Sequence, residues 1–272
     1  MGSVVPSNAR RGLPRVLIIA GSDSGGGAGI QADIKTVTML GGYAATAVTA
    51  ITVQNTLGVS AVHPVPPGIV AGQIRAVLED IGADAVKIGM LGDAATVEAV
   101  ADALMGVSAP IVLDPVMVAK GGASLLAEEA VEALLRRLLP HAAVVTPNAP
   151  ELEVLAGSDV ADEADMLLAA QELLGMGPAA VLAKGGHLEG ERVVDWLVSH
   201  NGQQRFEAPR IATRSTHGTG CTLASAVATG LAAGLPLAVA VERARGFVLS
   251  AMAAAPGLGQ GHGPLGHNFA LL

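Results

Sequence analysis

The sequence predicts an α/β fold in which a mostly parallel central sheet carries helices on both faces. Short runs rich in Val, Ile and Ala alternate with longer segments of helical periodicity, as repeated β-α units do. These short runs are continuously hydrophobic, which indicates strands that are buried on both faces. Polar and glycine-rich segments follow the strands, and in such sheets ligands bind at the carboxyl ends of the strands.

The expected elements follow this alternation along the chain. We expect strands over 15–21, 45–53, 84–91, 110–118, 142–148 and 179–186. We expect helices over 28–40, 69–82, 94–105, 127–140, 162–177, 220–233 and 237–254. Residues 192–207 depart from the pattern and predict an antiparallel hairpin that turns at Asn201-Gly202. Because no linker or low-complexity tract divides the chain, we expect a disordered leader over 1–14 and a single domain over 15–272.

The composition restricts the classes of partner. The 272 residues are 51% hydrophobic and carry a formal net charge of -8 without a basic run, whereas nucleic-acid binding needs clustered Lys and Arg. No stretch holds the roughly 18 unbroken apolar residues of a membrane span. The single cysteine excludes an intramolecular disulfide and fits a reducing compartment. We therefore expect a cytoplasmic protein with no nucleic-acid and no membrane partner.

The loop "GSDSGGGAG" follows the first expected strand. It is not a phosphate-binding P-loop, because no Lys follows its glycines. Residues 27–32 fit the dinucleotide pattern GxGxxA, but residues 45–60 hold no acidic residue for the ribose, so that interpretation fails. Two interpretations stay open: close approach of the backbone to a small polar ligand, or a tight strand-to-helix turn.

The segment "HGTGC" precedes an Ala-rich helix and holds the only cysteine, Cys221. The backbone N–H groups of Gly218, Thr219 and Gly220 would point into one concavity, and a helix N-terminus stabilises anions. The same field would lower the pKa of Cys221 below its usual ~8.5 and give a reactive thiolate. The alternative is a buried, inert cysteine that packs as a small hydrophobic residue.

"STHGTGCTLASA" resembles the anion-hole signature of the ribokinase-like family. Within that family, residues 15–266 resemble the hydroxymethylpyrimidine/phosphomethylpyrimidine kinases of thiamine biosynthesis, through these segments in order: "AGSDSGGGAGIQADIKT", "TVQNTLGV", "KIGML", "LDPVMVAKGG", "TPNAPE", "KGGHLEG" and "GHGP". The resemblance implies a ribokinase-like fold and Mg²⁺-dependent transfer of the ATP γ-phosphoryl group to a hydroxymethyl group. In bifunctional members the phosphate just installed is then phosphorylated as well. Family members are commonly homodimers.

The resemblance also implies roles on the nucleotide side of the site. Cys221 matches the family's base, and Gly218, Thr219 and Gly220 match the cradle for the transferring charge. Lys184 matches the lysine that neutralises ATP phosphates. Asn148 and Glu151 are expected to organise Mg²⁺ through water, with Asp114 as a weaker candidate for the metal. Asp114 and Lys120 also border the expected site. The alternative for Asn148 and Glu151 is a helix N-cap with a first-turn carboxylate.

Gln54 is the expected substrate discriminator. Its carboxamide offers the donor and acceptor that complement an aminopyrimidine, whereas the alternative is a polar residue that ends a buried strand. Other positions that match the pyrimidine pocket are Ala28, Asp33, Thr52, Met90 and Val116, and Thr52 stands where some relatives carry Val. Asp33 could equally be a solvated helix residue. The spacing of His187, His217 and His262 predicts no metal site. A pyridoxal kinase of the same fold and a non-catalytic pyrimidine sensor remain the alternative functions.

Overall fold

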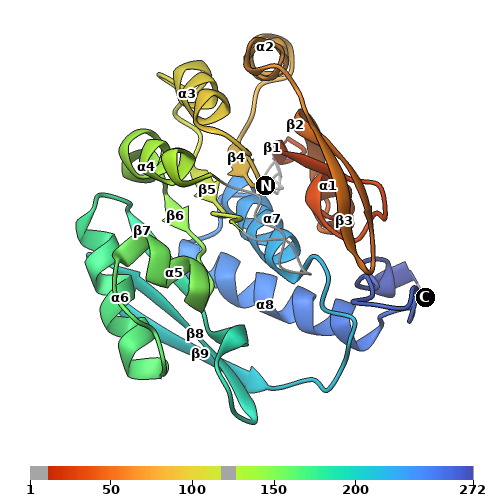
Figure 1. Cartoon of the computed structure of the whole chain (residues 1–272), viewed down its shortest axis with the longest axis vertical. Coiled ribbons are helices and arrows are strands. Elements are labelled where there is room, and N and C mark those ends of the chain that lie inside the picture. Colours follow the sequence, from red (N-terminus) through yellow and green to blue (C-terminus); the bar gives the residue numbers. More distant parts are fainter. Residues whose placement is uncertain (1–11, 118–126, 272) are drawn as a thin grey trace, which may run out of the picture.

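A computed structural model describes residues 12–117 and 127–271 (Figure 1). Within these residues one sheet of nine strands has the order β3-β2-β1-β4-β5-β6-β7-β8-β9. The strands are β1 Arg15–Asp23, β2 Tyr43–Asn55, β3 Gly58–Pro64, β4 Ala85–Ile88, β5 Ile111–Leu113, β6 Val144–Val145, β7 Ala180–Lys184, β8 Arg192–Ser199 and β9 Gly202–Pro209. The α-helices are α1 Gly29–Met39, α2 Pro67–Asp80, α3 Ala94–Ala103, α4 Glu128–Arg137, α5 Ala149–Ala156, α6 Glu163–Gly175, α7 Thr219–Ala232 and α8 Leu237–Ala253.

Six neighbouring strands of the sheet, in the order β2-β1-β4-β5-β6-β7, pair in parallel, and antiparallel strands flank them at both edges. β3 pairs antiparallel with β2 at one edge, and β8 and β9 continue the sheet beyond β7 at the other. Helices α1 to α6 lie between the parallel strands along the chain, as crossover connections require, whereas α7 and α8 follow β9. The predicted fold class, a mostly parallel sheet with helices on both faces, is confirmed.

Two hydrophobic cores explain why the strands are continuously apolar. In β1, Leu17 and Ile19 face the core that α2, α3, α4, α5 and α6 cover. Val16, Ile18 and Ala20, the alternate residues of the same strand, face a second core that α1, α7 and α8 cover. Figure 1 shows α7 and α8 side by side, and these two helices share many contacts. Since both faces of β1 are buried, neither set of side chains can be polar without a partner.

The structure differs from the prediction at the edge, at strand ends and at α5, a helix that is not among those expected from the sequence. The predicted hairpin is confirmed as β8 and β9, with Gly202 at φ 130 beside the turn. β3 was not predicted, because its side chains are mostly exposed and it lacks the continuous hydrophobicity of the central strands. The strand expected over 142–148 ends at Val145, since Asn148 already caps α5.

Residues 1–11 of the expected leader lie outside the described residues, and so does Lys120. In the described part, the Pro14 carbonyl accepts a hydrogen bond from the Tyr43 N–H (2.8 Å). The division into a leader and a single domain stays a prediction. None of the helices within 12–117 and 127–271 is long and apolar enough to cross a membrane.

Candidate active site

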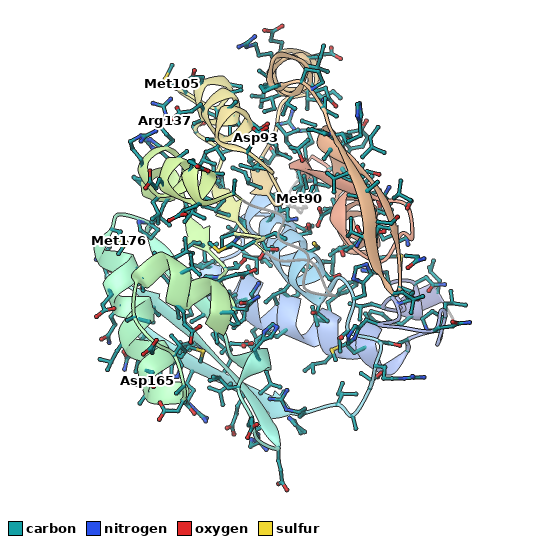
Figure 2. All side chains as sticks on the ribbon, viewed as in Figure 1. Met90, Asp93, Met105, Arg137, Asp165 and Met176 are labelled. Carbon is teal, nitrogen blue, oxygen red and sulfur yellow. The ribbon has the colours of Figure 1, made fainter. Side chains whose placement is uncertain are left out.

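The carboxyl ends of the parallel strands open into a cavity of about 960 Å³. All but one of the described residues that the sequence singled out for a site line this cavity: Ala28, Thr52, Gln54, Met90, Asp114, Val116, Asn148, Glu151, Lys184, Gly218, Thr219, Gly220 and Cys221. Figure 2 shows Met90 near the middle of the molecule, whereas Met105 and Met176 lie at its periphery. Residues from distant parts of the chain therefore meet at one edge of the sheet.

Asp33 is the exception, because its side chain is fully buried and lies outside the cavity. It forms an ion pair with Lys87 (Oδ2 to Nζ, 3.0 Å) and accepts a hydrogen bond from Ser225 Oγ (2.7 Å). Asp33 thus neutralises an ammonium that β4 points into the second core, between α1 and α7. The interpretation of Asp33 as a solvated helix residue is therefore wrong, and its expected role towards the substrate stays a prediction.

Lys87 is the group that makes Asp33 necessary, and sequence analysis missed it. Burial alone would lower the pKa of Lys87, but Asp33 and the nearby Cys221 and Asp114 raise it above its ordinary value, so the ammonium is charged. Lys87 also lines the cavity. A lysine inside a continuously apolar strand, "AVKIG", was the available signal, because a buried charge needs a partner.

The segment 217–221 begins helix α7, and Gly218 is its N-cap. Gly218 has φ 85, the left-handed region that favours glycine, and a Cβ there would collide with the Gly27 carbonyl. A Cβ at Gly27 would in turn collide with the imidazole of His217. The two glycine-rich loops therefore interlock. The N–H groups of Gly220 and Cys221, in the first turn of α7, have no acceptor within the helix.

Cys221 lies in the same first turn, but its thiol does not have the expected low pKa. Burial, and after it the carboxylates of Asp33 and Asp114, raise the pKa of the thiol, which is about 11 in the folded protein. Lys87 and a hydrogen bond from the Gly29 N–H oppose this rise without cancelling it. The predicted lowering of the pKa by the helix field is therefore wrong, because desolvation outweighs the partial charge of the helix end.

Lys184, Asp114 and Glu151 form a charged cluster beside Gly220. Lys184 Nζ lies 2.9 Å from Asp114 Oδ1 and 3.8 Å from Glu151 Oε2. A Cβ at Gly220 would lie 3.4 Å from Lys184 Nζ, so the ammonium lies next to the first turn of α7. Burial, together with Asp114, raises the pKa of Glu151 to about 7, and Lys184 opposes this rise. Asp114 and Glu151 both lie beside Lys184, and Lys87 also lowers the pKa of Asp114.

Asn148 and Glu151 form a capping box at the start of α5. Asn148 Oδ1 accepts from the Glu151 N–H (3.0 Å), and Glu151 Oε2 accepts from the Asn148 N–H (2.8 Å). The capping interpretation is confirmed, and it leaves Glu151 Oε1 without a role in the box. Within the described ranges, no three His, Cys, Asp or Glu side chains cluster as ligands for a metal ion.

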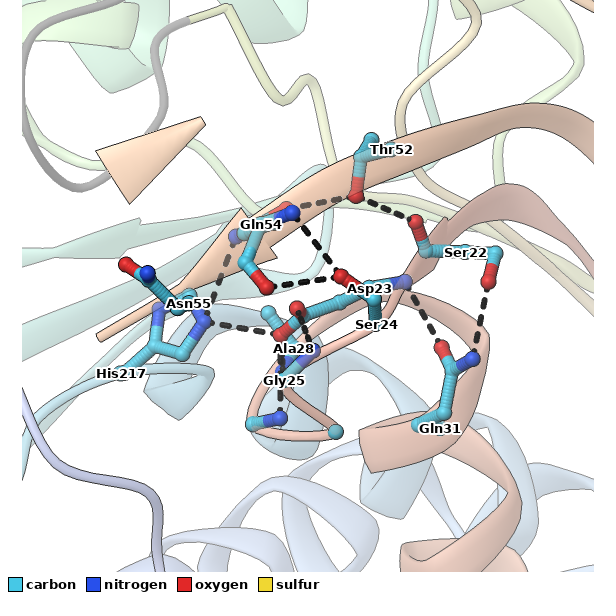
Figure 3. Close-up of polar contacts among 12 residues, drawn as sticks. Ser22, Asp23, Ser24, Gly25, Ala28, Gln31, Thr52, Gln54, Asn55 and His217 are labelled. Carbon is cyan, nitrogen blue, oxygen red and sulfur yellow. Dashed lines mark hydrogen bonds and ion pairs between the residues drawn. The ribbon is translucent and has the colours of Figure 1, made fainter. Parts of the chain in front are cut away.

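Asp23 and His217 were not assigned a role by sequence analysis, and they form a second polar cluster in the cavity (Figure 3). The Asp23 carboxylate accepts from the N–H groups of Gly25 (2.8 Å), Gly27 (3.0 Å) and Ala28 (2.8 Å). It also contacts His217 Nε2 at 2.9 Å. The loop "GSDSGGGAG" is thus folded around its own aspartate. The tight-turn interpretation of this loop is supported, and Ala28 and Gly29 still line the cavity.

The segment "GHGP" near the C-terminus ties two parts of this site together. His262 N–H donates to the Thr56 carbonyl (2.9 Å) at the turn between β2 and β3. His217 N–H donates to the Gly263 carbonyl (3.1 Å). This motif therefore positions the loop that contains Cys221 against the strand that contains Gln54.

Known proteins resemble this chain over nearly its whole length. The family model described as "Phosphomethylpyrimidine kinase" matches residues 23–266. A hydroxymethylpyrimidine/phosphomethylpyrimidine kinase of Streptomyces coelicolor is 50% identical over 258 residues, which cover 95% of this chain and 96% of that protein. A thiamine biosynthesis bifunctional protein of Geobacter sulfurreducens is 52% identical over 263 residues; the match covers 96% of this chain but only 54% of that relative's length.

A solved structure shows the same architecture. The ADP complex of Bacillus subtilis pyridoxal kinase superimposes with a TM-score of 0.89, at 36% identity, over 96% of this chain and 99% of that chain. This neighbour has the ribokinase-like fold that the sequence predicted. The structural likeness identifies the fold, whereas the sequence matches identify the family: the chain belongs to the phosphomethylpyrimidine kinase family.

Proposed function

We propose that this protein transfers the γ-phosphoryl group of ATP to the hydroxymethyl oxygen of 4-amino-5-hydroxymethyl-2-methylpyrimidine, and then to the monophosphate so formed, in thiamine biosynthesis. Relatives named hydroxymethylpyrimidine/phosphomethylpyrimidine kinase are about 50% identical over most of the chain. The observation that carries the proposal is that Gln54, which suits an aminopyrimidine, lines the same cavity as the Gly218–Cys221 turn, which suits a phosphoryl group.

Recognition of the acceptor is assigned to the carboxamide of Gln54. An aminopyrimidine offers a ring nitrogen that accepts and an adjacent amino group that donates. A carboxamide supplies the matching donor and acceptor in one plane. Ala28, Thr52, Met90 and Val116 supply much of the surrounding wall, and Met90 is only 8% exposed. A pocket of this kind holds a small flat ring and fixes its orientation through few polar groups.

Phosphoryl transfer asks a protein chiefly for positioning and charge neutralisation. The N–H groups of Gly220 and Cys221 are placed to stabilise charge on the transferring group, and Lys184 adds a positive charge on the nucleotide side. The thiolate form of Cys221 accepts the proton of the hydroxymethyl group as the bond to phosphorus forms, which returns Cys221 to the neutral thiol. In the second phosphorylation the acceptor is already an anion, so a base matters less there.

Mg²⁺ fits the donor set of the cluster formed by Asp114, Glu151 and Lys184. Mg²⁺ prefers carboxylate oxygens and keeps several water ligands, so one or two carboxylates together with the ATP phosphates suffice. Asp114 and Glu151 would hold it, and the ion would neutralise charge on the phosphates. The state of Glu151 supports this assignment, because its pKa is raised to about 7 beside Asp114, and a bound cation would favour its ionised form.

The deciding experiment measures ADP release with ATP and Mg²⁺ and three acceptors in parallel: the hydroxymethylpyrimidine, its monophosphate and pyridoxal. Turnover of both pyrimidines with little turnover of pyridoxal is the expected result. Preference for pyridoxal would overturn the substrate but keep the kinase, and the likeness to a pyridoxal kinase makes this acceptor the necessary comparison. Silence with all three acceptors would favour a non-catalytic sensor.

We also propose that the protein is a cytoplasmic homodimer, as its family members commonly are. The single cysteine is consistent with a reducing compartment. Light scattering coupled to size-exclusion chromatography gives the oligomeric state directly. A mass near 27.0 kDa, that of one chain, would exclude the dimer.

A further inference from the structure

The side-chain amide of Gln54 is held between two groups on opposite sides (Figure 3). Its Oε1 position lies 3.0 Å from Thr52 Oγ1, and its Nε2 position lies 3.3 Å from His217 Nε2. Its backbone is fixed as well, because Ser24 Oγ donates to the Gln54 carbonyl (2.7 Å) and accepts from its N–H (2.9 Å). The oxygen and nitrogen of a carboxamide can exchange places by a half-turn, so the neighbours decide which orientation is stable.

The Thr52 side favours nitrogen. Thr52 Oγ1 lies 2.7 Å from the Ser22 carbonyl oxygen, which can only accept, so the hydroxyl proton is committed to that bond. Towards Gln54, Thr52 Oγ1 can therefore only accept. An amide oxygen at 3.0 Å would place two acceptors face to face, whereas an amide nitrogen at that position donates a hydrogen bond.

The His217 side favours oxygen, and it does so independently. His217 Nε2 lies 2.9 Å from Asp23 Oδ2, and that carboxylate also accepts three backbone N–H groups. An ionised carboxylate only accepts, so His217 Nε2 carries a proton and donates it. An amide nitrogen 3.3 Å from this nitrogen would place two donors face to face, whereas an amide oxygen there can share the His217 proton with Asp23.

We propose that Asp23, through His217, and Ser22, through Thr52, lock the Gln54 carboxamide with its oxygen towards His217 and its nitrogen towards Thr52. This is a half-turn from the orientation with oxygen towards Thr52. Asp23, His217 and Thr52 are then positioning residues for recognition of the acceptor. Both constraints come from groups that cannot reverse their roles, since a backbone carbonyl and an ionised carboxylate only accept.

The consequence concerns specificity and rests on the proposed function. With the amide locked, its free oxygen lone pair accepts from the amino group of the pyrimidine, and its free N–H donates to the ring nitrogen. The amino group then lies on the His217 side of the ring. An acceptor with the opposite edge, the 4-oxo pyrimidine whose ring nitrogen carries a proton, would need the amide to turn and break both contacts. The lock therefore rejects the oxo ring before any catalytic step.

A direct test reads the amide itself and does not depend on turnover. The side-chain NH₂ signals of Gln54 are assigned in the ¹⁵N-labelled full-length protein by their loss in Gln54→Glu. Nuclear Overhauser contacts from these protons to the Thr52 side chain, and none to the His217 ring, are the expected result. Contacts to the His217 ring, or contacts of equal strength to both residues, would overturn the lock.

A second test compares kcat/KM for the aminopyrimidine and for its 4-oxo counterpart. The wild-type protein is expected to favour the amino form by at least about 10²-fold, as sites built on paired hydrogen bonds do. Thr52→Val removes the acceptor that holds the amide nitrogen. We expect it to lower this preference about tenfold, mostly through KM of the aminopyrimidine, while Thr52→Ser keeps the wild-type ratio.

The outcomes separate the lock from the proposed function. If Thr52 had a purely structural role, Thr52→Val would lower the melting temperature and would slow turnover of both acceptors alike. The ratio of their kcat/KM values would then stay unchanged, and that result would overturn the lock. If the wild-type protein turned over neither pyrimidine, the proposed function would fail, whereas the nuclear Overhauser contacts would still decide the orientation of Gln54.

Discussion

At the scale of single residues, Cys221 must lose its own thiol proton before it can act as a base. With a pKa of about 11, the thiol is almost entirely protonated near neutral pH. We expect Cys221→Ala to slow the first phosphorylation by about 10²-fold, the usual scale for an acid–base group. The second phosphorylation is expected to slow less, because its acceptor is already ionised. ADP release with each pyrimidine measures both effects, and equal slowing of the two steps would contradict a role as base.

The raised pKa of Cys221 also predicts a pH dependence with a definite sign. Only the thiolate accepts a proton, so the rate of the first step should rise about tenfold per pH unit between pH 7 and 9. Cys221→Ala should show a flat profile over that range. The stability of the folded state depends on pH in the opposite direction. The neutral thiol stabilises the folded state fully below pH 9.0, its ordinary pKa, and this contribution is lost as the pH rises towards 11. A rate that does not change with pH in the wild-type protein would exclude the thiolate.

At the scale of elements, the sequence predicted what depends on neighbours in the chain. The period of each central helix, the Asn201-Gly202 turn and the capping box of Asn148 and Glu151 are local features, and the structure confirms them. It could not predict β3, whose pairing with β2 is an edge contact between exposed residues. It also could not show that Gly27 and Gly218 need each other, because the two loops lie far apart in the sequence and meet only in the folded chain.

This contact between loops can be tested at Gly218. Gly218→Ala would place a left-handed alanine and a Cβ against the Gly27 carbonyl, so we expect it to cost about 2–4 kcal/mol and most of the activity. Gly106→Ala is the matched control, since Gly106 has φ 78 but no atom within 4 Å of its Cβ position. We expect this control to cost about 1 kcal/mol. Urea unfolding gives both values, and equal costs would mean that the contact with Gly27 contributes nothing.

At the scale of the whole molecule, the alternation of strands and helices was enough to predict the sheet, its two covered faces and the edge at which ligands bind. It was not enough to separate residues that line the cavity from residues just beneath it. Asp33 follows Ala28 by only five positions, and both were expected in the pocket, yet α1 turns Asp33 into the core and leaves Ala28 at the wall. Lys87 accounts for this difference, since its ammonium forms an ion pair with Asp33 of α1. Ser225 of α7 donates a hydrogen bond to the same carboxylate. A charge in the middle of the sheet thus holds α1, β4 and α7 together beneath the site.

This buried pair predicts a strongly non-additive double-mutant cycle. Lys87→Met leaves the Asp33 carboxylate buried without its ammonium, and Asp33→Asn leaves the Lys87 ammonium uncompensated, so each single change should cost about 3–5 kcal/mol. The double variant should cost well under the sum, because neither charge then remains unpaired. Asp84→Asn provides the control: Asp84 pairs with Arg15 at 2.7 Å, but the two side chains are 34% and 42% exposed, so we expect a loss of at most about 1 kcal/mol. Free energies of unfolding from urea titration close the cycle. Additive costs at Lys87 and Asp33 would show that the two residues stabilise the fold independently. The ion pair between them would then not be what holds α1, β4 and α7 together.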